Sequence, residues 1–182
     1  MTRRISVTRK VAVGATLALT AGLGWVGTGA ASAATPLASC AISGSAAFTP
    51  SLSATATPTS AKLTGTLTGC TGKSGVKSGT FTGTMNLGPQ TCGSMLAPPR
   101  PLATAPVTIK WKGGTTSVVN ATLAIGSGDF SLGGPVTKNR FKGHKFSAPH
   151  LKPTAVHPVS TDCSKVQVQS LDFSGTSRAT VN

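Results

Sequence analysis

The stretch APVTIKWKGGTTSVVNATLAI, Ala105 to Ile125, decides the fold class of this chain. Apolar residues occupy alternate positions up to Trp111, which is the period of a strand with one buried face and one solvated face. Gly113-Gly114 follows, and glycine readily takes the positive φ values that a tight hairpin turn requires. Apolar residues then alternate again from Val119 onward. The stretch therefore predicts a β-hairpin with Trp111 packed in the core.

Strand signals on both sides of this hairpin extend the pattern to the rest of the chain. Lys62 to Gly69 and Gly79 to Leu87 alternate between apolar and small polar residues, and weaker signals lie at Cys40 to Phe48, around Phe130 and at Lys165 to Val181. Gly, Ser and Thr dominate, and runs of helix-forming residues are missing, which is typical of all-β proteins. We predict an antiparallel β-sandwich or a partly open barrel of about eight short strands.

The first 33 residues have the pattern of a secretory signal peptide. Basic residues come first, an uncharged apolar run follows from Val11 to Val26, and Ala31-Ser32-Ala33 fits the small-x-small cleavage pattern. Arg3-Arg4 leaves the twin-arginine route open beside general secretion. We therefore expect residues 1–33 to be a signal peptide and residues 34–182 to be one secreted β-domain, extracellular or associated with the cell wall. No second long apolar run follows, so we expect no membrane span.

The four cysteines, Cys40, Cys70, Cys92 and Cys163, all lie after the expected cleavage point. An even number of cysteines in a secreted chain predicts disulfides, here two, and sequence alone allows three pairings. If the first two strands are antiparallel neighbours, the cysteines that open the first and close the second lie at the same end of the sheet. This geometry favours Cys40–Cys70 and, for the remaining two, Cys92–Cys163.

The layout of the chain resembles a group of secreted actinobacterial proteins of unknown function. The resemblance depends on Cys40, LTGTLTGCTG at 63–72, TFTGT at 80–84, TCGSML at 91–96, the VTIKWKGGTTS hairpin and Cys163. It covers most of residues 34–182, and its motifs are structural. It implies a compact, disulfide-linked β-domain and supplies no catalytic residue.

The composition argues against common hydrolytic chemistry. The chain has no Glu, and its three carboxylate side chains are Asp129, Asp162 and Asp172, so a pair of carboxylates facing one bond is not expected. Ser, His and Asp are all present, but no G-x-S-x-G phrase stands between a strand and a helix. We therefore expect a protein without enzymatic activity and without a cofactor.

One segment stands out, KNRFKGHKFSAPHLKPTAVHP at 138–158, which the pattern predicts to be a long loop. Five cations lie in it: Lys138, Arg140, Lys142, Lys145 and Lys152. So do all three histidines of the chain: His144, His150 and His157. Three interpretations compete: a solvated loop docked by its phenylalanines, an anion-binding loop, and a metal site formed by the imidazoles. No metal-ligand spacing supports the third.

Charge indicates the class of partner. Of the 17 Lys and Arg, 13 lie after residue 33, against three Asp. A secreted protein of this charge is expected to bind an anionic cell-envelope polymer, here through the basic loop 138–152. Nucleic acid would bind in vitro, but a secreted location argues against a physiological role for it. The alternatives are a His-containing metal-binding or enzymatic protein, and a protein-interaction or inhibitor module that uses the loop from Cys92 to Pro101.

Overall fold

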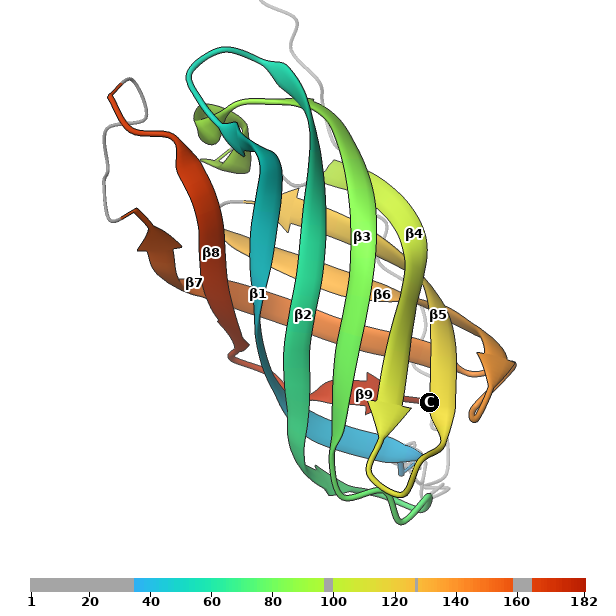
Figure 1. Ribbon diagram of the computed structural model, residues 1–182. Helices are drawn as coiled ribbons and strands as arrows, with labels where there is room; N and C mark the ends of the chain where they lie inside the picture. Colours follow the sequence, from blue (N-terminus) through green and yellow to red (C-terminus); the bar gives the residue numbers. More distant parts are fainter. Residues whose placement is uncertain (1–34, 97–99, 127, 159–164) are drawn as a thin grey trace, which may run out of the picture. The chain divides into compact units, whose positions relative to one another are not determined.

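The computed structural model describes residues 35–96, 100–126, 128–158 and 165–182, which fold into a closed antiparallel β-barrel (Figure 1). Its strands follow the order of the chain around the barrel. They are β1 (Ala38–Leu52), β2 (Thr57–Thr71), β3 (Gly79–Gln90), β4 (Arg100–Trp111), β5 (Thr116–Gly126), β6 (Asp129–Asn139), β7 (Lys145–His157), β8 (Val168–Gly175) and the short β9 (Ala179–Val181). A 3-10 turn, η1 (Cys92–Leu96), lies between β3 and β4.

The barrel closes because β1 pairs with β2 on one side and with β8 on the other. β9 pairs with the start of β1 and with β7, next to the end of β8. The prediction of an all-β antiparallel domain is confirmed, and the sheet is a fully closed barrel, neither a sandwich nor partly open. Closure pairs the first and last long strands of the described sheet, although β3 and β4 pair with each other only from Gly79↔Trp111 to Gly83↔Val107.

The hairpin that decided the fold class forms as predicted. β4 and β5 pair from Lys110↔Thr116 to Arg100↔Ile125, and the turn holds Gly113 and Gly114 at φ values of 104° and 88°. Trp111 is 3% exposed and Val119 is fully buried. The period-2 pattern therefore identified the residues that face the barrel interior.

The interior is filled with side chains, as expected for an eight-stranded barrel. Facing glycines in β1 and β2, Gly44 and Gly65, leave room for two aromatic rings. A Cβ atom at Gly65 would lie 2.3 Å from Cζ of Phe81, and one at Gly44 would lie 3.0 Å from Cζ of Phe173. The two rings lie 6.4 Å apart between centroids. The glycines of the LTGTLTG phrase and of β1 thus serve packing as well as turns.

The disulfide Cys40–Cys70 joins the start of β1 to the end of β2, as predicted. Both cysteines are buried, at 2% and 5% exposure. The predicted Cys92–Cys163 pairing includes Cys163, which lies outside the described residues, as does the expected signal peptide of residues 1–33.

The prediction of a long loop at 138–158 is wrong. β6 continues to Asn139, a short turn follows, and β7 occupies Lys145–His157. Phe146, Ala148 and Leu151 face the interior, so the segment supplies a strand of the core. Prolines and cations hid the alternation, and register shifts that add a residue to β7 occur next to Pro149 and Pro153. Across the described ranges, no helix is long and apolar enough to cross a membrane.

Candidate functional site: the basic end of the barrel

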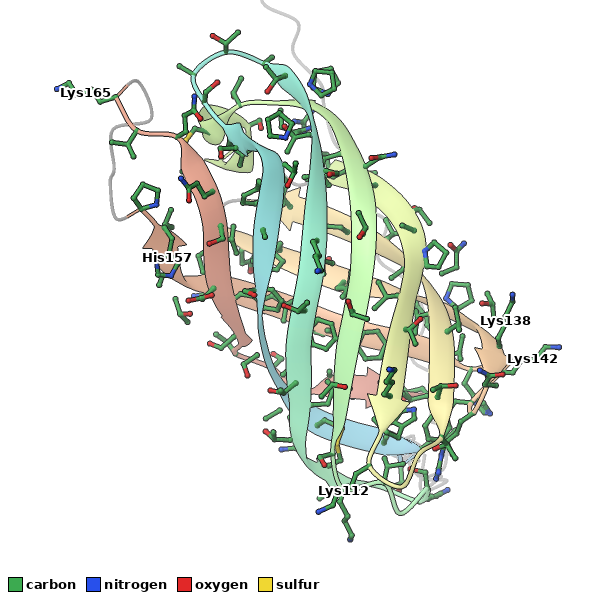
Figure 2. The ribbon with its side chains drawn as sticks, viewed as in Figure 1. Lys112, Lys138, Lys142, His157 and Lys165 are labelled. Carbon is green, nitrogen blue, oxygen red and sulfur yellow. A yellow bond between two sulfur atoms is a disulfide. The ribbon has the colours of Figure 1, made fainter. Side chains whose placement is uncertain are left out.

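Basic side chains gather at one end of the barrel, on three alternate hairpin turns of the chain. The β2–β3 turn carries Lys73 and Lys77, the β4–β5 turn is flanked by Lys110 and Lys112, and the β6–β7 turn brings Lys138, Arg140, Lys142 and Lys145. We call these eight residues the basic end. In Figure 2, Lys112, Lys138 and Lys142 lie on that side, and Lys165 and His157 lie on the other. The seven lysines are exposed, and Arg140 is partly buried.

No carboxylate side chain of the described residues accompanies these cations. Asp129 begins β6, directly after the β5–β6 turn at the opposite end, and Asp172 lies within β8. Each of these two aspartates is paired with a histidine. In the described part of the chain, no aspartate therefore pairs with the seven lysines, and the side chains of the basic end carry an excess of positive charge.

Arg140 ties the three turns together. Its guanidinium donates a hydrogen bond of 2.8 Å to the carbonyl oxygen of Ser74 in the β2–β3 turn and one of 3.3 Å to Oγ1 of Thr115 in the β4–β5 turn. It also lies 5.1 Å from the ring centroid of Phe141. Arg140 is therefore a positioning residue that holds the turns, and the lysines around it are the groups left for an anion.

A buried polar chain fixes the backbone beneath Arg140. The indole N–H of Trp111 donates to Oγ of Ser117 at 2.9 Å, and this hydroxyl donates to the carbonyl oxygen of Arg140 at 2.6 Å. The Trp111 ring also meets Phe141 edge-on, with centroids 5.5 Å apart. The core residue predicted from the hairpin thus anchors the β6–β7 turn.

The structure regroups the predicted anion-binding residues. Lys138, Arg140, Lys142 and Lys145 lie together, but Lys152 does not join them. Lys152 lies opposite Ser174 in β8, seven residues beyond Lys145 along β7. In an extended strand, seven residues place Lys152 roughly 23 Å from Lys145. Lys152 therefore lies on the side of the barrel, away from the other four cations, because the segment is a strand and not a loop.

Four cations of the basic end, Lys73, Lys77, Lys110 and Lys112, were missed by reasoning on one segment. A signal for them exists in the sequence. In an antiparallel meander every second turn lies at the same end of the sheet, so lysines that flank alternate turns must gather there.

The three histidines are not brought together. His144 lies in the β6–β7 turn, His150 within β7 and His157 at its end, so successive imidazoles are separated by roughly 20 Å of extended strand. Among the described residues there is no group of three or more His, Cys, Asp or Glu placed to hold a metal ion. The interpretation of His144, His150 and His157 as one metal site is therefore wrong.

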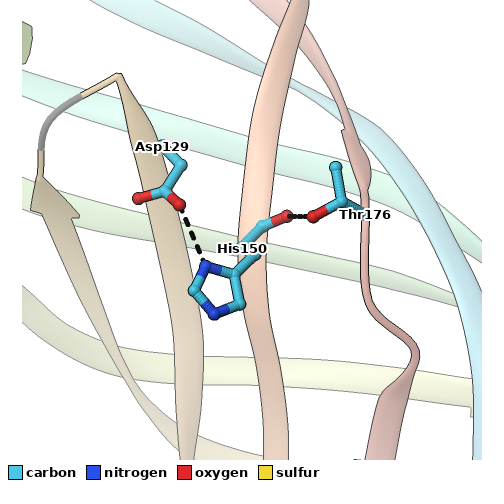
Figure 3. Close-up of polar contacts among 3 residues, drawn as sticks. All are labelled: Asp129, His150 and Thr176. Atoms are coloured by element: carbon cyan, nitrogen blue, oxygen red, sulfur yellow. Dashed lines mark hydrogen bonds and ion pairs between the residues drawn. The ribbon is translucent and has the colours of Figure 1, made fainter.

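Two of the histidines each meet an aspartate. Nδ1 of His150 lies 3.0 Å from Oδ2 of Asp129, and the carbonyl oxygen of His150 accepts a bond of 3.1 Å from Oγ1 of Thr176 (Figure 3). Nε2 of His157 lies 3.0 Å from Oδ2 of Asp172. The side chains of His150 and His157 are 63% and 50% exposed, so both pairs are surface interactions in water.

The segment from Cys92 to Pro101 lies at the end of the barrel opposite the basic end. It begins with η1, whose first residue donates its backbone N–H to the carbonyl oxygen of Ser53 at 2.9 Å. Oγ of Ser94 donates to Oε1 of Gln90 at 2.8 Å. Residues 97–99 lie outside the described residues, and Arg100 already belongs to β4. The described part is thus a compact turn fastened to the β1–β2 connection.

Comparisons with protein-family models, with curated proteins and with solved structures found no match. Inferences about function therefore depend on the geometry and chemistry of this chain, and the resemblance to secreted actinobacterial proteins remains a prediction.

Proposed function

We propose that this protein is a secreted, non-enzymatic β-barrel that binds an anionic polymer of the cell envelope through its basic end. The observation that carries the proposal is the separation of charge. Eight cations lie on three adjacent turns, and both aspartates of the described residues lie elsewhere. Such a surface attracts a polyanion by long-range steering and by release of the polymer's counterions, and it needs no deep pocket.

The arrangement of the turns supports a polymer as partner over a single small anion. The lysines project from three separate hairpins that Arg140 holds in contact, so the positive charge is spread over the whole end. A flexible lysine ammonium is a point charge that contacts phosphate or carboxylate without fixed geometry. A chain of anionic groups can meet several of these charges at once.

The location and the lack of catalysis are parts of the same proposal. A disulfide between Cys40 and Cys70 is typical of proteins that fold outside the cytoplasm. The distance between the histidines and the exposure of both His–Asp pairs support a binding role over a catalytic one.

The test is binding of the barrel, residues 34–182, to purified wall polymers with phosphate or carboxylate groups across a salt series. If about six lysines engage the polymer, the association constant should fall by roughly 300-fold between 50 and 200 mM salt. Replacing Lys73, Lys112 and Lys142 together with glutamine should lower the salt slope by about two and weaken binding about 50-fold near 150 mM salt.

The matched control removes three positive charges elsewhere. Lys62, Arg100 and Lys152 are exposed and lie outside the basic end. Because charges farther than the Debye length of about 8 Å are largely screened at 150 mM salt, this triple glutamine variant should lose less than about threefold in affinity. Equal losses in the two variants, or binding that does not change with salt, would contradict the proposal.

A further inference from the structure

A groove of about 410 Å³ lies beside the basic end, on the outer surface of β2, β3 and β4. The regular pairing of β2 with β3 ends at Leu67↔Gly79. The next contact between the two strands is the hydrogen bond of 3.0 Å from the backbone N–H of Cys70 to the carbonyl oxygen of Lys77, and the groove lies in the gap between these two contacts. Thr68 and Ser78 border the groove between these two points. The groove thus follows from the way in which the hairpin leaves the barrel.

Three kinds of group line this groove. Lys110 and Lys112 of the basic end border it, and Lys112 is held by the bond of 2.9 Å from its backbone N–H to the carbonyl oxygen of Ser78. Leu67 and Trp111 lie beneath the groove, and both side chains are buried. The hydroxyls come from Thr66, Thr68, Ser78 and Thr80.

The hydroxyls are available to a ligand. Thr66 shares one hydrogen bond of 3.2 Å with Ser43. Within the described ranges, the hydroxyls of Thr68, Ser78 and Thr80 bond to no other group of the protein. Each can both donate and accept, so they match the hydroxyls of a polyol or sugar, while the two lysines match a phosphate.

The described surface of the barrel has no exposed aromatic ring, the feature on which proteins stack the bases of single-stranded nucleic acids. Among the described residues every aromatic ring is buried except that of Phe141, which is partly buried and packs against Trp111. The groove therefore offers contacts to a phosphate and its hydroxylated neighbour, and none to a base.

We infer that the groove is a subsite for one repeat of a polyol phosphate, a phosphodiester-linked polymer that carries free hydroxyl groups. This inference rests on the proposed function and narrows it from any polyanion to one class. Lys110 and Lys112 take the phosphate, and the hydroxyls of Thr68, Ser78 and Thr80 bond the polyol. The remaining lysines of the basic end hold neighbouring phosphates by charge alone.

The test compares poly(glycerol phosphate), inorganic polyphosphate and single-stranded DNA of equal charge number, with the purified chain at about 300 mM salt, where the counterion contribution is reduced. The polyol phosphate should bind about tenfold more tightly than polyphosphate, because hydroxyl bonds add to the charge contacts. The double variant Thr68→Val, Thr80→Val should lose this advantage and keep its affinity for polyphosphate within about twofold. Valine preserves side-chain shape and strand preference.

Thr82→Val, Thr84→Val is the control, since both residues are exposed on β3 outside the groove. Unchanged polyphosphate binding also shows that a variant is folded. Equal affinity for the two phosphate polymers, tighter binding of DNA, or the same loss in the control would overturn the inference and leave the proposed function standing. Failure of every polyanion to bind would overturn the proposed function and the inference with it.

Discussion

Replacing Ser117 with alanine should destabilise the barrel and loosen its basic end at the same time. Ser117 is 1% exposed, and its hydroxyl accepts the indole N–H of Trp111 and donates to the carbonyl oxygen of Arg140. Alanine leaves both groups without this partner. At about 1–3 kcal/mol for each buried unsatisfied group, with partial relaxation, the expected loss in free energy of unfolding is about 2–4 kcal/mol.

Urea unfolding of residues 34–182, followed by circular dichroism, measures this loss. With a slope of about 2 kcal/mol per molar urea for a domain of this size, the midpoint should fall by about 1–2 M. Amide exchange should rise in the β6–β7 turn, where the backbone N–H of Arg140 bonds to the carbonyl oxygen of Thr116 at 2.9 Å. Ser43→Ala is the control, because its hydroxyl also makes a hydrogen bond, to Thr66, but is exposed, so water replaces the partner.

A double-mutant cycle with Trp111→Phe isolates the hydrogen bond. Phenylalanine removes the indole donor, so Ser117→Ala should cost about 1–2 kcal/mol less in that background than in the native one. A loss below about 0.5 kcal/mol for Ser117→Ala alone, or fully additive effects of the two changes, would refute the reasoning that this buried chain anchors the turn.

Three further changes test the packing and the surface by the same unfolding measurement. Gly65→Ala should lower the free energy of unfolding by more than about 2 kcal/mol, because the new methyl group would collide with an aromatic ring and with a backbone carbonyl 2.4 Å away. A loss under about 1 kcal/mol would mean that β1 and β2 move apart easily to make room for it. Replacing Cys40 and Cys70 together with alanine should cost up to about 3.6 kcal/mol, since the disulfide joins residues 30 positions apart, and an unchanged midpoint would argue against the chain-entropy account. Asp172→Asn should change stability by less than about 1 kcal/mol, because the His157–Asp172 pair is half exposed, and a larger loss would show an interaction that is stronger than a surface pair.

Local patterns predicted much of the sheet. The alternation around Trp111 and the two glycines after it predicted the turn, β5 and most of β4, although β4 begins at Arg100, before the predicted start at Ala105. The pairing Cys40–Cys70 followed from the same logic, because the first two strands are antiparallel neighbours. Where prolines interrupt the alternation, as in β7, the pattern predicted a loop, because bulges that absorb a proline are set by the neighbouring strands.

The candidate site was predictable in part. The charge of the segment around Arg140 marked the β6–β7 turn, and four of the five cations chosen there lie in the basic end. Lys152 lies apart from them because residues that could be close together in a loop are far apart in an extended strand. The lysines of the other two turns are distant in sequence, and the pairing of strands is what brings them to the same end.

The amino-acid sequence by itself determined the all-β class, the central hairpin with its inward-facing residues and the excess of positive charge. These follow from local rules, namely the period of two, the conformational freedom of glycine and the count of ionisable groups. The tertiary structure alone decided that the sheet closes and that Arg140 hydrogen-bonds to two neighbouring turns. It also decided that lysines from separate hairpins lie at one end of the barrel, beside a groove lined by hydroxyl groups. Those features depend on which strands pair and in what register, and contacts between distant segments carry no local sequence signal.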